Sequence, residues 1–465
     1  MQRLIKAQLT VDSLNSNVIE AEYAVRGPIV QLAQKLEQNG RKIVYFNIGN
    51  PQQVGQQPLS YVREILALLS YPKLLSSPNR TKLFTTDGIK RAEEILKYHP
   101  VGLGAYTQSA GMPFIKQAVA EFINKRDNIH SNPENIFLTD GASKGVDLVL
   151  QSLITDKKDG IMIPIPQYPL YSADITLFGG THVRYYLDEE NNWSLNRDML
   201  DETYTNAEKK GVNTRAIVVI NPNNPTGSLL TKNNIEMILE FADEYNLAII
   251  ADEVYQENIY NPEDQFYSFA KVAEEKEIKI PLFSLHSTSK GFLGECGYRG
   301  GYIELRNISE DVCSVLLKLR SISLCSNTAG QIMLFLMVTP PKKGEESFQL
   351  YIEEKNSILG SLGRKAKKIA TGLDKIDGII CPTPPAAMYL FPKLELPKNK
   401  DYSGKEADFR FCEALVMEEG IVTVPGSGFG QLPGTQHLRM TFLPPEEMIP
   451  VILEKFTRCY KKFVK

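Results

Sequence analysis

A lysine flanked by hydroxyl side chains and followed by a glycine-rich loop is the first group in the sequence that could do chemistry. Lys290 comes three residues after Ser287 and one after Ser289, and Arg299 follows nine residues later. The residues before the hydroxyls, 282–285, are mostly apolar. A strand that ends in hydroxyls and a lysine, before a loop too rich in glycine to continue as a helix, indicates a site at the end of a sheet.

The neighbours of Lys290 favour a chemical role, although a lysine is most often a solvated surface charge. Ser287, Ser289 and Arg299 could together bind a dianionic phosphate beside the amine. An amine next to a phosphate site suits an aldehyde cofactor, and pyridoxal phosphate binds a lysine in this way, as a Schiff base. Lys290 is therefore the predicted catalytic lysine.

The segment HSTSKGFLGECGYRGGY resembles the Ser-x-x-Lys signature, with a downstream arginine, of fold-type I pyridoxal-phosphate aminotransferases of class I/II. Three further motifs occur in the order found in that family: N-P-N-N-P-T-G from residue 221, D-E-V-Y from 252 and H-L-R-M-T-F-L from 437. A match in order over the whole chain is stronger support than any single motif. Within the family the sequence looks most like the alanine aminotransferase branch.

A second possible anion site lies where an expected strand, 136–139, turns through Gly141 into a helix. The first residues of that helix are Ala142 and Ser143. Free backbone N–H groups and the positive end of the helix dipole suit a phosphate there. By itself the turn could equally be an ordinary capped helix start. The resemblance implies that Ala142 and Ser143 bind the same phosphate as Ser287 and Arg299.

Asp252 follows five apolar residues, so its carboxylate is expected to be buried and to need a cationic partner. A protonated pyridine nitrogen would be that partner. The resemblance further implies that Tyr168 stacks on the pyridine ring, and that Asn224 and Tyr255 donate hydrogen bonds to the 3′ oxygen of the cofactor. From the sequence alone, Tyr168 could equally be a core tyrosine.

Substrate-binding residues follow from the same resemblance. Arg439 matches the arginine whose guanidinium fork binds the substrate α-carboxylate, although a single strand arginine is most often a surface ion pair. Asn224 would also contact that carboxylate, and the turn at Gly49 would line the substrate pocket. Tyr106 matches a tyrosine that reaches the cofactor phosphate of the neighbouring subunit, which implies a homodimer.

Composition sets limits on the other classes of protein. The chain has 465 residues, a net charge of −3 and 23% charged residues, which indicates neither a nucleic-acid nor a membrane partner. Its six cysteines form no C-x-x-C pair and show no zinc-ligand spacing, so no metal site is expected. Asp12, Glu20 and Glu22 argue against a transit peptide, and we expect a cytoplasmic protein.

Alternating apolar strands and amphipathic helices predict an α/β fold. The resemblance makes it a three-layer fold-type I transferase, with a mostly parallel central sheet and a smaller α/β domain. We expect residues 1–70 to form an arm and part of the small domain, 71–330 the large cofactor-binding domain, and 331–465 the rest of the small domain. The expected elements include helices over 21–40, 89–97, 235–245, 310–319, 329–337 and 345–376, and strands over 43–49, 216–220 and 386–394.

The resemblance implies a two-stage transamination of amino acids and 2-oxo acids, most simply L-alanine with 2-oxoglutarate by a ping-pong mechanism. Glyoxylate is an alternative amino acceptor. The family also leads us to expect a glutamine and a glycine where Pro385 and Ala386 stand. This departure bears on side-chain preference and not on the chemistry.

Two other functions occur on related folds. A lyase of the aminocyclopropane-carboxylate synthase type shares the same site but expels a leaving group. A cofactor-binding transcription regulator would need an amino-terminal DNA-binding domain of about 60 or more residues and a basic surface. Only about 40 non-core residues, with no basic excess, precede the turn at Gly49.

Overall fold

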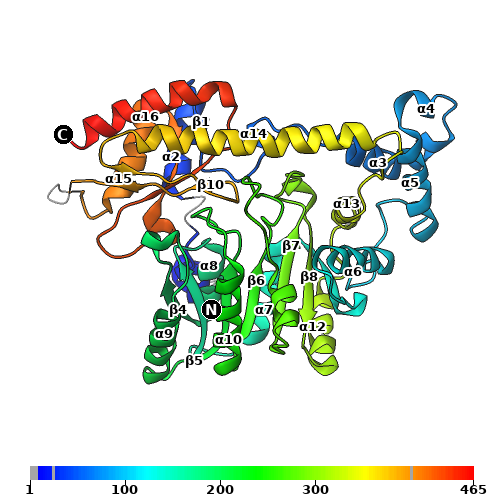
Figure 1. The fold of residues 1–465 in the computed structure, drawn as a ribbon, viewed down its shortest axis with the longest axis horizontal. Coiled ribbons are helices and arrows are strands. Elements are labelled where there is room, and N and C mark those ends of the chain that lie inside the picture. Colours follow the sequence, from blue (N-terminus) through cyan, green and yellow to red (C-terminus); the bar gives the residue numbers. More distant parts are fainter. Residues whose placement is uncertain (1–8, 24–26, 398–401) are drawn as a thin grey trace, which may run out of the picture.

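The computed structural model describes residues 9–23, 27–397 and 402–465. One large sheet with helices on both faces forms the body of the molecule, and a smaller group of short strands and helices lies along one side of it (Figure 1). The expected α/β architecture with a mostly parallel sheet is confirmed.

The large sheet has seven strands in the order β2-β8-β7-β6-β5-β3-β4. The five strands from β4 to β7 run parallel, and β8 is antiparallel to both of its neighbours. The strands are β2 Ile136–Asp140, β3 Asp159–Ile165, β4 Thr181–Tyr186, β5 Asn213–Ile220, β6 Ala248–Asp252, β7 Leu282–Ser287 and β8 Gly300–Arg306.

The inner stretch of the central strand β5, residues 216–220, is buried and continuously apolar because both faces of the sheet are covered. In β5, Ile217 and Val219 belong to one buried cluster, while Val218 and Ile220 belong to another on the opposite face. Side chains alternate between faces along a strand, so a strand buried on both sides must be continuously apolar. This is why the run AIVVI correctly predicted a central strand.

Two sets of helices cover the two faces. The first set packs with Val218 and Ile220 and consists of α7 Ala142–Leu153, α8 Leu170–Leu177 and α12 Glu310–Ile322. The second packs with Ile217 and Val219 and consists of α9 Arg197–Lys209, α10 Lys232–Glu244 and α11 Phe269–Glu275. A separate helical cluster beside β2 contains α3 Ser60–Ser70, α5 Thr86–Tyr98, α6 Pro113–Asp127 and α13 Thr328–Val338, with the short α4 Arg80–Leu83 nearby.

The smaller part of the molecule joins the two ends of the chain. Strand β1 Val44–Tyr45 pairs in parallel with β12 Ile421–Val422. The other short strands are β9 Ile379–Ile380, β10 Tyr389–Leu390, β11 Lys393–Leu394, β13 Val424–Pro425 and β14 Leu438–Thr441. They pack with α2 Pro28–Gln38, α14 Phe348–Asp374, α15 Ala407–Ala414 and α16 Ile449–Phe463. The domain boundaries at residues 70 and 330 stay a prediction.

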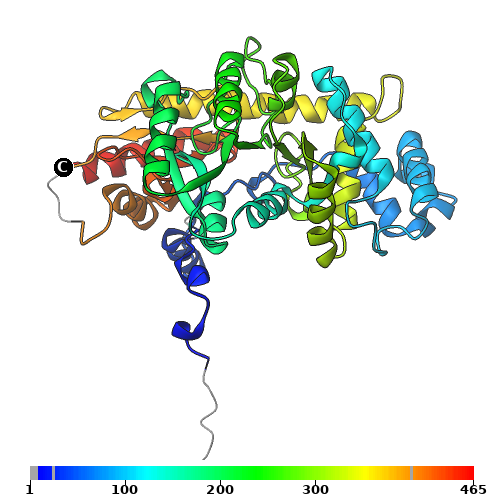
Figure 2. The same ribbon diagram turned by 90° about the horizontal axis from the view of Figure 1, so that it is seen from below.

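Helix α14 links the two parts, and Figure 1 shows it running along one edge of the molecule. Tyr351 near its start lies in the cluster beside β2, and Leu373 near its end lies in the core of the smaller part. In Figure 2 the dark blue N-terminal segment with α1 Ser16–Glu20 projects from the body. Asn17 of α1 donates to the carbonyl of Leu177 at 3.3 Å.

Several expected elements differ in extent. The predicted strand over 386–394 is two strands, since Pro392 lies between β10 and β11 and has no N–H to donate. The predicted strand over 43–49 pairs only at Val44–Tyr45. The helix expected from residue 21 begins at Pro28, and residues 24–26 of that range lie outside the described residues. The helix expected over 89–97 is longer, because Thr85 caps α5 by accepting from the Gly88 N–H.

Candidate active site

A cavity of about 990 Å³ lies beside the carboxyl ends of β5, β6 and β7 and is lined on the other side by residues of the smaller part. Carboxyl ends of parallel strands meet at one edge of a sheet, where α/β proteins place their ligand sites. The cavity brings together all of the sequence-predicted site residues except Tyr106: Gly49, Ala142, Ser143, Tyr168, Asn224, Asp252, Tyr255, Ser287, Lys290, Arg299 and Arg439.

Lys290 reaches into this cavity from the loop after β7, and its Nζ donates to the carbonyl of Gly49 at 2.8 Å. Asn258 fixes the backbone that follows, because its side chain accepts from the Gly291 N–H at 2.9 Å and donates to the Gly291 carbonyl at 3.2 Å. Burial lowers the pKa of Lys290, but Tyr389 and Cys296 raise it, and the net shift is upward. The amine is held beside the turn that the sequence predicted as part of the substrate pocket.

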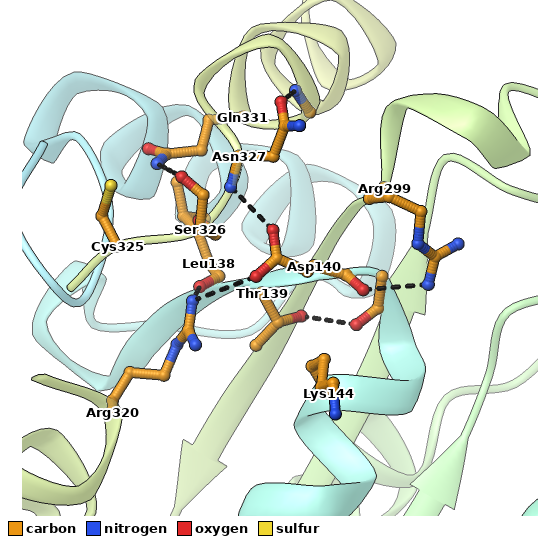
Figure 3. Close-up of polar contacts among 12 residues, drawn as sticks. Leu138, Thr139, Asp140, Lys144, Arg299, Arg320, Cys325, Ser326, Asn327 and Gln331 are labelled. Carbon is orange, nitrogen blue, oxygen red and sulfur yellow. Dashed lines mark hydrogen bonds and ion pairs between the residues drawn. The ribbon is translucent and has the colours of Figure 1, made fainter. Parts of the chain in front are cut away.

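The anion-binding end of the cavity is built where β2 turns through Gly141 into α7. Gly141 has φ +76°, and a Cβ there would lie 2.5 Å from Nη2 of Arg299. That Nη2 donates to the Asp140 carbonyl at 2.9 Å and to Oγ of Ser143 at 3.2 Å (Figure 3 shows the bond to Asp140). The guanidinium therefore lies directly against the N-terminus of α7, where the helix dipole also favours an anion.

Asp252 ends β6 and lines the cavity. It is 6% exposed, and burial raises its pKa, while a 2.8 Å hydrogen bond from the Tyr171 hydroxyl opposes that rise. No salt bridge to Asp252 is formed among the described residues. A buried carboxylate with only a hydroxyl and a distant Val254 N–H as donors is electrostatically incomplete and would be stabilised by a cation in the cavity.

Two tyrosines that the sequence analysis did not assign complete the walls. The Tyr389 hydroxyl lies 2.7 Å from that of Tyr255, and the Tyr23 hydroxyl lies 2.6 Å from that of Tyr168. Burial raises the pKa of Tyr255 and of Tyr168 well above the usual value, so both are neutral donors at physiological pH. Tyr389 lies within the strand predicted over 386–394, whereas Tyr23 near the N-terminus belongs to no motif.

Arg439 of β14 is 1% exposed and enters the cavity from the smaller part. Its Nη1 donates to Oδ1 of Asn224 at 3.1 Å and its Nη2 to the carbonyl of Asn47 at 2.7 Å. The guanidinium lies 4.5 Å from the ring centre of Tyr389 and 4.8 Å from that of Phe429. No carboxylate is paired with it among the described residues, so this cation is available for an anionic ligand.

Tyr106 is the predicted residue that the structure does not bring to this cavity. It is 77% exposed and lies beside a different hollow of about 970 Å³, together with Tyr98 and Phe114. The segment that carries it is fixed, because Thr328 donates to the Ala105 carbonyl at 3.2 Å. A role of Tyr106 in the site of its own subunit is excluded by this position.

Comparison with known proteins decides the family. The family model described as aminotransferase class I and II matches residues 77–456. The chain belongs to the class I and II aminotransferases. Alanine aminotransferase 1, mitochondrial, from Arabidopsis thaliana is 46% identical over 98% of this chain and 87% of its own length. Glutamate–glyoxylate aminotransferase 2 from the same plant is 44% identical over 98% of this chain and 96% of its own length.

A solved alanine aminotransferase from Pyrococcus furiosus has the same fold, with a TM-score of 0.78 and 26% identity over 97% of this chain and 100% of that chain. The fold-type I assignment made from the sequence motifs is thus confirmed. As a member of this family, the chain described by our structure uses pyridoxal phosphate and acts on amino acids and 2-oxo acids.

The cavity fits this cofactor on three counts. Asp252 is a buried carboxylate that could pair with the protonated pyridine nitrogen. Tyr168 and Tyr255 line the same cavity with neutral rings and hydroxyls. Arg299 and the start of α7 could hold the phosphate. Lys290 supplies an amine on the same wall.

The cytoplasmic location expected from the sequence is contradicted by the relatives. Alanine aminotransferases from Arabidopsis thaliana and Dictyostelium discoideum, at 44–46% identity, are named as mitochondrial. The acidic residues near the N-terminus, such as Glu20 and Glu22, were therefore a poor guide to location. Within the described residues no helix is long and apolar enough to span a membrane, and no cluster of three metal-binding side chains occurs.

Proposed function

We propose that this aminotransferase transfers the amino group of L-alanine to 2-oxoglutarate, giving pyruvate and L-glutamate. The names of the relatives support alanine as donor. The observation that carries the proposal is the cavity itself, in which an amine, a carboxylate-binding cation and a buried carboxylate converge from three different elements.

The cofactor would be held by residues at three places in the cavity. Ser287, Arg299 and the backbone of Ala142 and Ser143 would bind the phosphate, Asp252 would pair with the ring nitrogen, and the ring would stack on Tyr168. The remaining predicted contacts, to the 3′ oxygen, would come from Asn224 and Tyr255. When bound, the cofactor withdraws electrons from the substrate α carbon and carries the amino group between the two substrates.

Lys290 would anchor the cofactor and, once displaced by the substrate amine, act as the base and acid at the α carbon. Its Nζ is held by the Gly49 carbonyl, so the amine is oriented by the backbone of the substrate-pocket turn. Asp252, Tyr255 and Arg439 around the cavity are almost fully buried, which would limit the access of water to the proton being moved.

Arg439 would bind the α-carboxylate that both substrates share. Its two Nη groups are spaced for two parallel hydrogen bonds to a carboxylate, and Asn224 lies within 3.1 Å to share the contact. The side chain of the substrate would then face the region of Asn50 and Gln53, which are neutral. A neutral subsite suits an enzyme that must accept both a methyl group and a second carboxylate.

We also propose that the enzyme is a homodimer in which Tyr106 contacts the cofactor phosphate of the neighbouring subunit. The exposure of Tyr106 supports this, as does the adjacent apolar surface, where Ile322 is 77% and Leu324 is 53% exposed. A mitochondrial location is a further proposal, supported by the names of the relatives.

Amino-acceptor competition tests the proposed reaction. The purified enzyme, loaded with pyridoxal phosphate, is given L-alanine together with 2-oxoglutarate or with glyoxylate, and kcat/KM is measured for each acceptor. The proposal predicts a higher kcat/KM for 2-oxoglutarate. A clear preference for glyoxylate would favour the second candidate function, that of a glutamate–glyoxylate aminotransferase. A relative of that name is 44% identical to this chain.

A further inference from the structure

Asp140 places a carboxylate at the edge of the anion-binding turn, where its negative charge would repel a bound phosphate. It is the last residue of β2 and directly precedes Gly141 and the N-terminus of α7. A negative charge there lowers the affinity for a phosphate dianion, because like charges repel strongly at short range in a partly buried site. The structure shows how this charge is controlled.

The side chain of Asp140 is directed away from α7 toward the segment between α12 and α13 (Figure 3). Its Oδ1 accepts from the backbone N–H of Asn327 at 2.7 Å, and its Oδ2 lies 3.8 Å from Nη2 of Arg320. That Nη2 also donates to the carbonyl of Leu138 at 3.4 Å. The Asp140 carboxylate is therefore held by a donor and a cation on the side opposite to the cavity.

Burial keeps the charge of Arg320 away from solvent, so the guanidinium depends on its contact with Asp140. Only 7% of its side chain is exposed, and its Nε has no hydrogen-bond partner among the described residues. A buried guanidinium with one carboxylate partner is costly to keep unless its charge is used. Asp140 is the carboxylate that pairs with it in the part of the chain that the structure describes.

The main chain of Asp140 serves the cavity while its side chain is turned away. Its carbonyl accepts from Nη2 of Arg299 at 2.9 Å, and Arg299 in turn reaches Ser143. Asp140 pairs across the sheet with Gly300. A Cβ on the neighbouring Gly301 would lie 2.8 Å from the carbonyl carbon of Gly141, so the turn packs against β8 at a position where only glycine fits.

We propose that Arg320 is a positioning residue for cofactor binding. It neutralises the Asp140 carboxylate and holds it outside the phosphate site, so that Arg299 and the start of α7 meet the phosphate without an opposing charge. The inference rests on the proposed phosphate site at Arg299 and Ser143. Binding of pyridoxal phosphate to the wild-type protein tests that site separately.

The experiment compares two ligands that differ only in the phosphate. Apoprotein is titrated with pyridoxal phosphate and with pyridoxal, and the dissociation constants are read from the absorbance of the Lys290 adduct. Arg320→Gln removes the cation and, with its shorter side chain, leaves the Asp140 charge without an ion-pair partner. It is expected to weaken pyridoxal phosphate binding by about tenfold or more, with pyridoxal changed by less than about twofold.

The double variant Asp140→Asn with Arg320→Gln removes both charges and keeps an acceptor for the Asn327 N–H. Its affinity for pyridoxal phosphate is expected to return to within about threefold of the wild type. Lys318→Met removes an exposed cation from the same helix and serves as the matched control, with both affinities unchanged. Equal losses for the two ligands in Arg320→Gln, or no recovery in the double variant, would overturn the proposal.

Asp140→Asn alone gives an independent reading if Arg320→Gln does not fold. It removes the carboxylate charge and leaves the cation of Arg320 in place on the side opposite to the cavity. The proposal predicts pyridoxal phosphate binding that is as tight as in the wild type or tighter, and unchanged pyridoxal binding. A tenfold loss of phosphate-dependent affinity would show that the carboxylate charge itself supports binding, contrary to the proposal.

Discussion

Single buried polar groups with incomplete partners define the chemistry of this enzyme. Arg439 and Asp252 are both almost fully buried, yet neither is in an ion pair with a described residue. Buried charges are stable only when paired, so each indicates a ligand group of opposite charge. For Arg439 that group is the proposed substrate carboxylate, and for Asp252 it is the cofactor nitrogen.

Arg439→Lys tests the carboxylate site. Lysine keeps the charge but cannot make two parallel hydrogen bonds, so KM for L-alanine and for L-glutamate is expected to rise together by about tenfold to a hundredfold. Steady-state kinetics with both substrates measure the effect. Arg410→Lys, which changes a half-buried arginine of α15 paired with Glu413, is the control and is expected to leave KM unchanged. A rise for only one substrate would contradict a shared α-carboxylate contact.

Glu253, next to Asp252, predicts a pH dependence of stability. Burial raises its pKa to about 8, partly offset by Arg126 and by the N–H of Phe269. The folded state therefore keeps a proton that the unfolded chain loses above its ordinary pKa. Stability from this group is present below about pH 4.5 and is lost as the pH rises toward 8.

Glu253→Gln is expected to flatten this dependence, because the amide keeps an acceptor for Phe269 and does not ionise. Urea unfolding at pH 5.5 and pH 8 measures it, and the wild type is expected to lose about 1–3 kcal/mol more than the variant between these values. Glu257→Gln changes a more exposed carboxylate that pairs with Lys355 and is the control. Identical pH profiles for wild type and Glu253→Gln would refute the assignment.

At the scale of elements, the N-terminus of α7 depends on a glycine both for its backbone conformation and for the proposed phosphate site. Gly141 is required both by its positive φ and by the approach of Arg299, which leaves no room for a Cβ. Gly211, between α9 and β5, has φ +77°, and a Cβ there would meet no atom within 4 Å. A substitution at Gly211 would therefore introduce backbone strain alone, whereas one at Gly141 would introduce both strain and a steric clash with Arg299.

Gly141→Ala and Gly211→Ala form a matched pair. Both are expected to lower the free energy of unfolding by about 1–2 kcal/mol through backbone strain. Gly141→Ala should also weaken pyridoxal phosphate binding by about tenfold, because Arg299 must move away from the helix start. Thermal unfolding and cofactor titration give the two quantities. Equal cofactor affinity in the two variants would show that Arg299 does not depend on this approach.

The elements that the sequence predicted well are those with strong local patterns. The continuous apolar run of β5 and the amphipathic α10 were placed to within a few residues. The short strands of the smaller part were not, since β1 and β12 form two-residue pairs between segments far apart in the chain. Such pairs are fixed by tertiary contacts and leave no periodic pattern.

At the scale of the whole molecule, the site is assembled from distant parts of the chain. Motifs predicted that Lys290, Asp252 and Arg439 belong together, and the cavity contains all three. Tyr23 and Arg320 could not be found this way, because their roles arise from contacts at 2.6 Å and 3.8 Å across the fold rather than from any motif. Location was the property that composition predicted wrongly.

Subunit complementation tests the proposed homodimer. Lys290→Ala and Tyr106→Ala chains are each expected to be nearly inactive alone. If Tyr106 acts across the interface, each mixed dimer has one intact site, so an equimolar exchanged mixture should regain about a quarter of wild-type activity. Sedimentation confirms that the mixture is dimeric. Absence of any recovery in a verified mixed dimer would place Tyr106 outside the neighbouring site.

The half-reaction with L-alanine tests the central claim most directly. The purified enzyme with pyridoxal phosphate is mixed with L-alanine without any 2-oxo acid, while the visible absorbance of the Lys290-bound cofactor and the released pyruvate are followed. The proposed function predicts loss of the visible band with one pyruvate per site in the wild type, and no release of pyruvate by Lys290→Ala. A band that L-alanine leaves unchanged would contradict the alanine assignment, and cofactor bound to Lys290→Ala with full turnover would contradict the site.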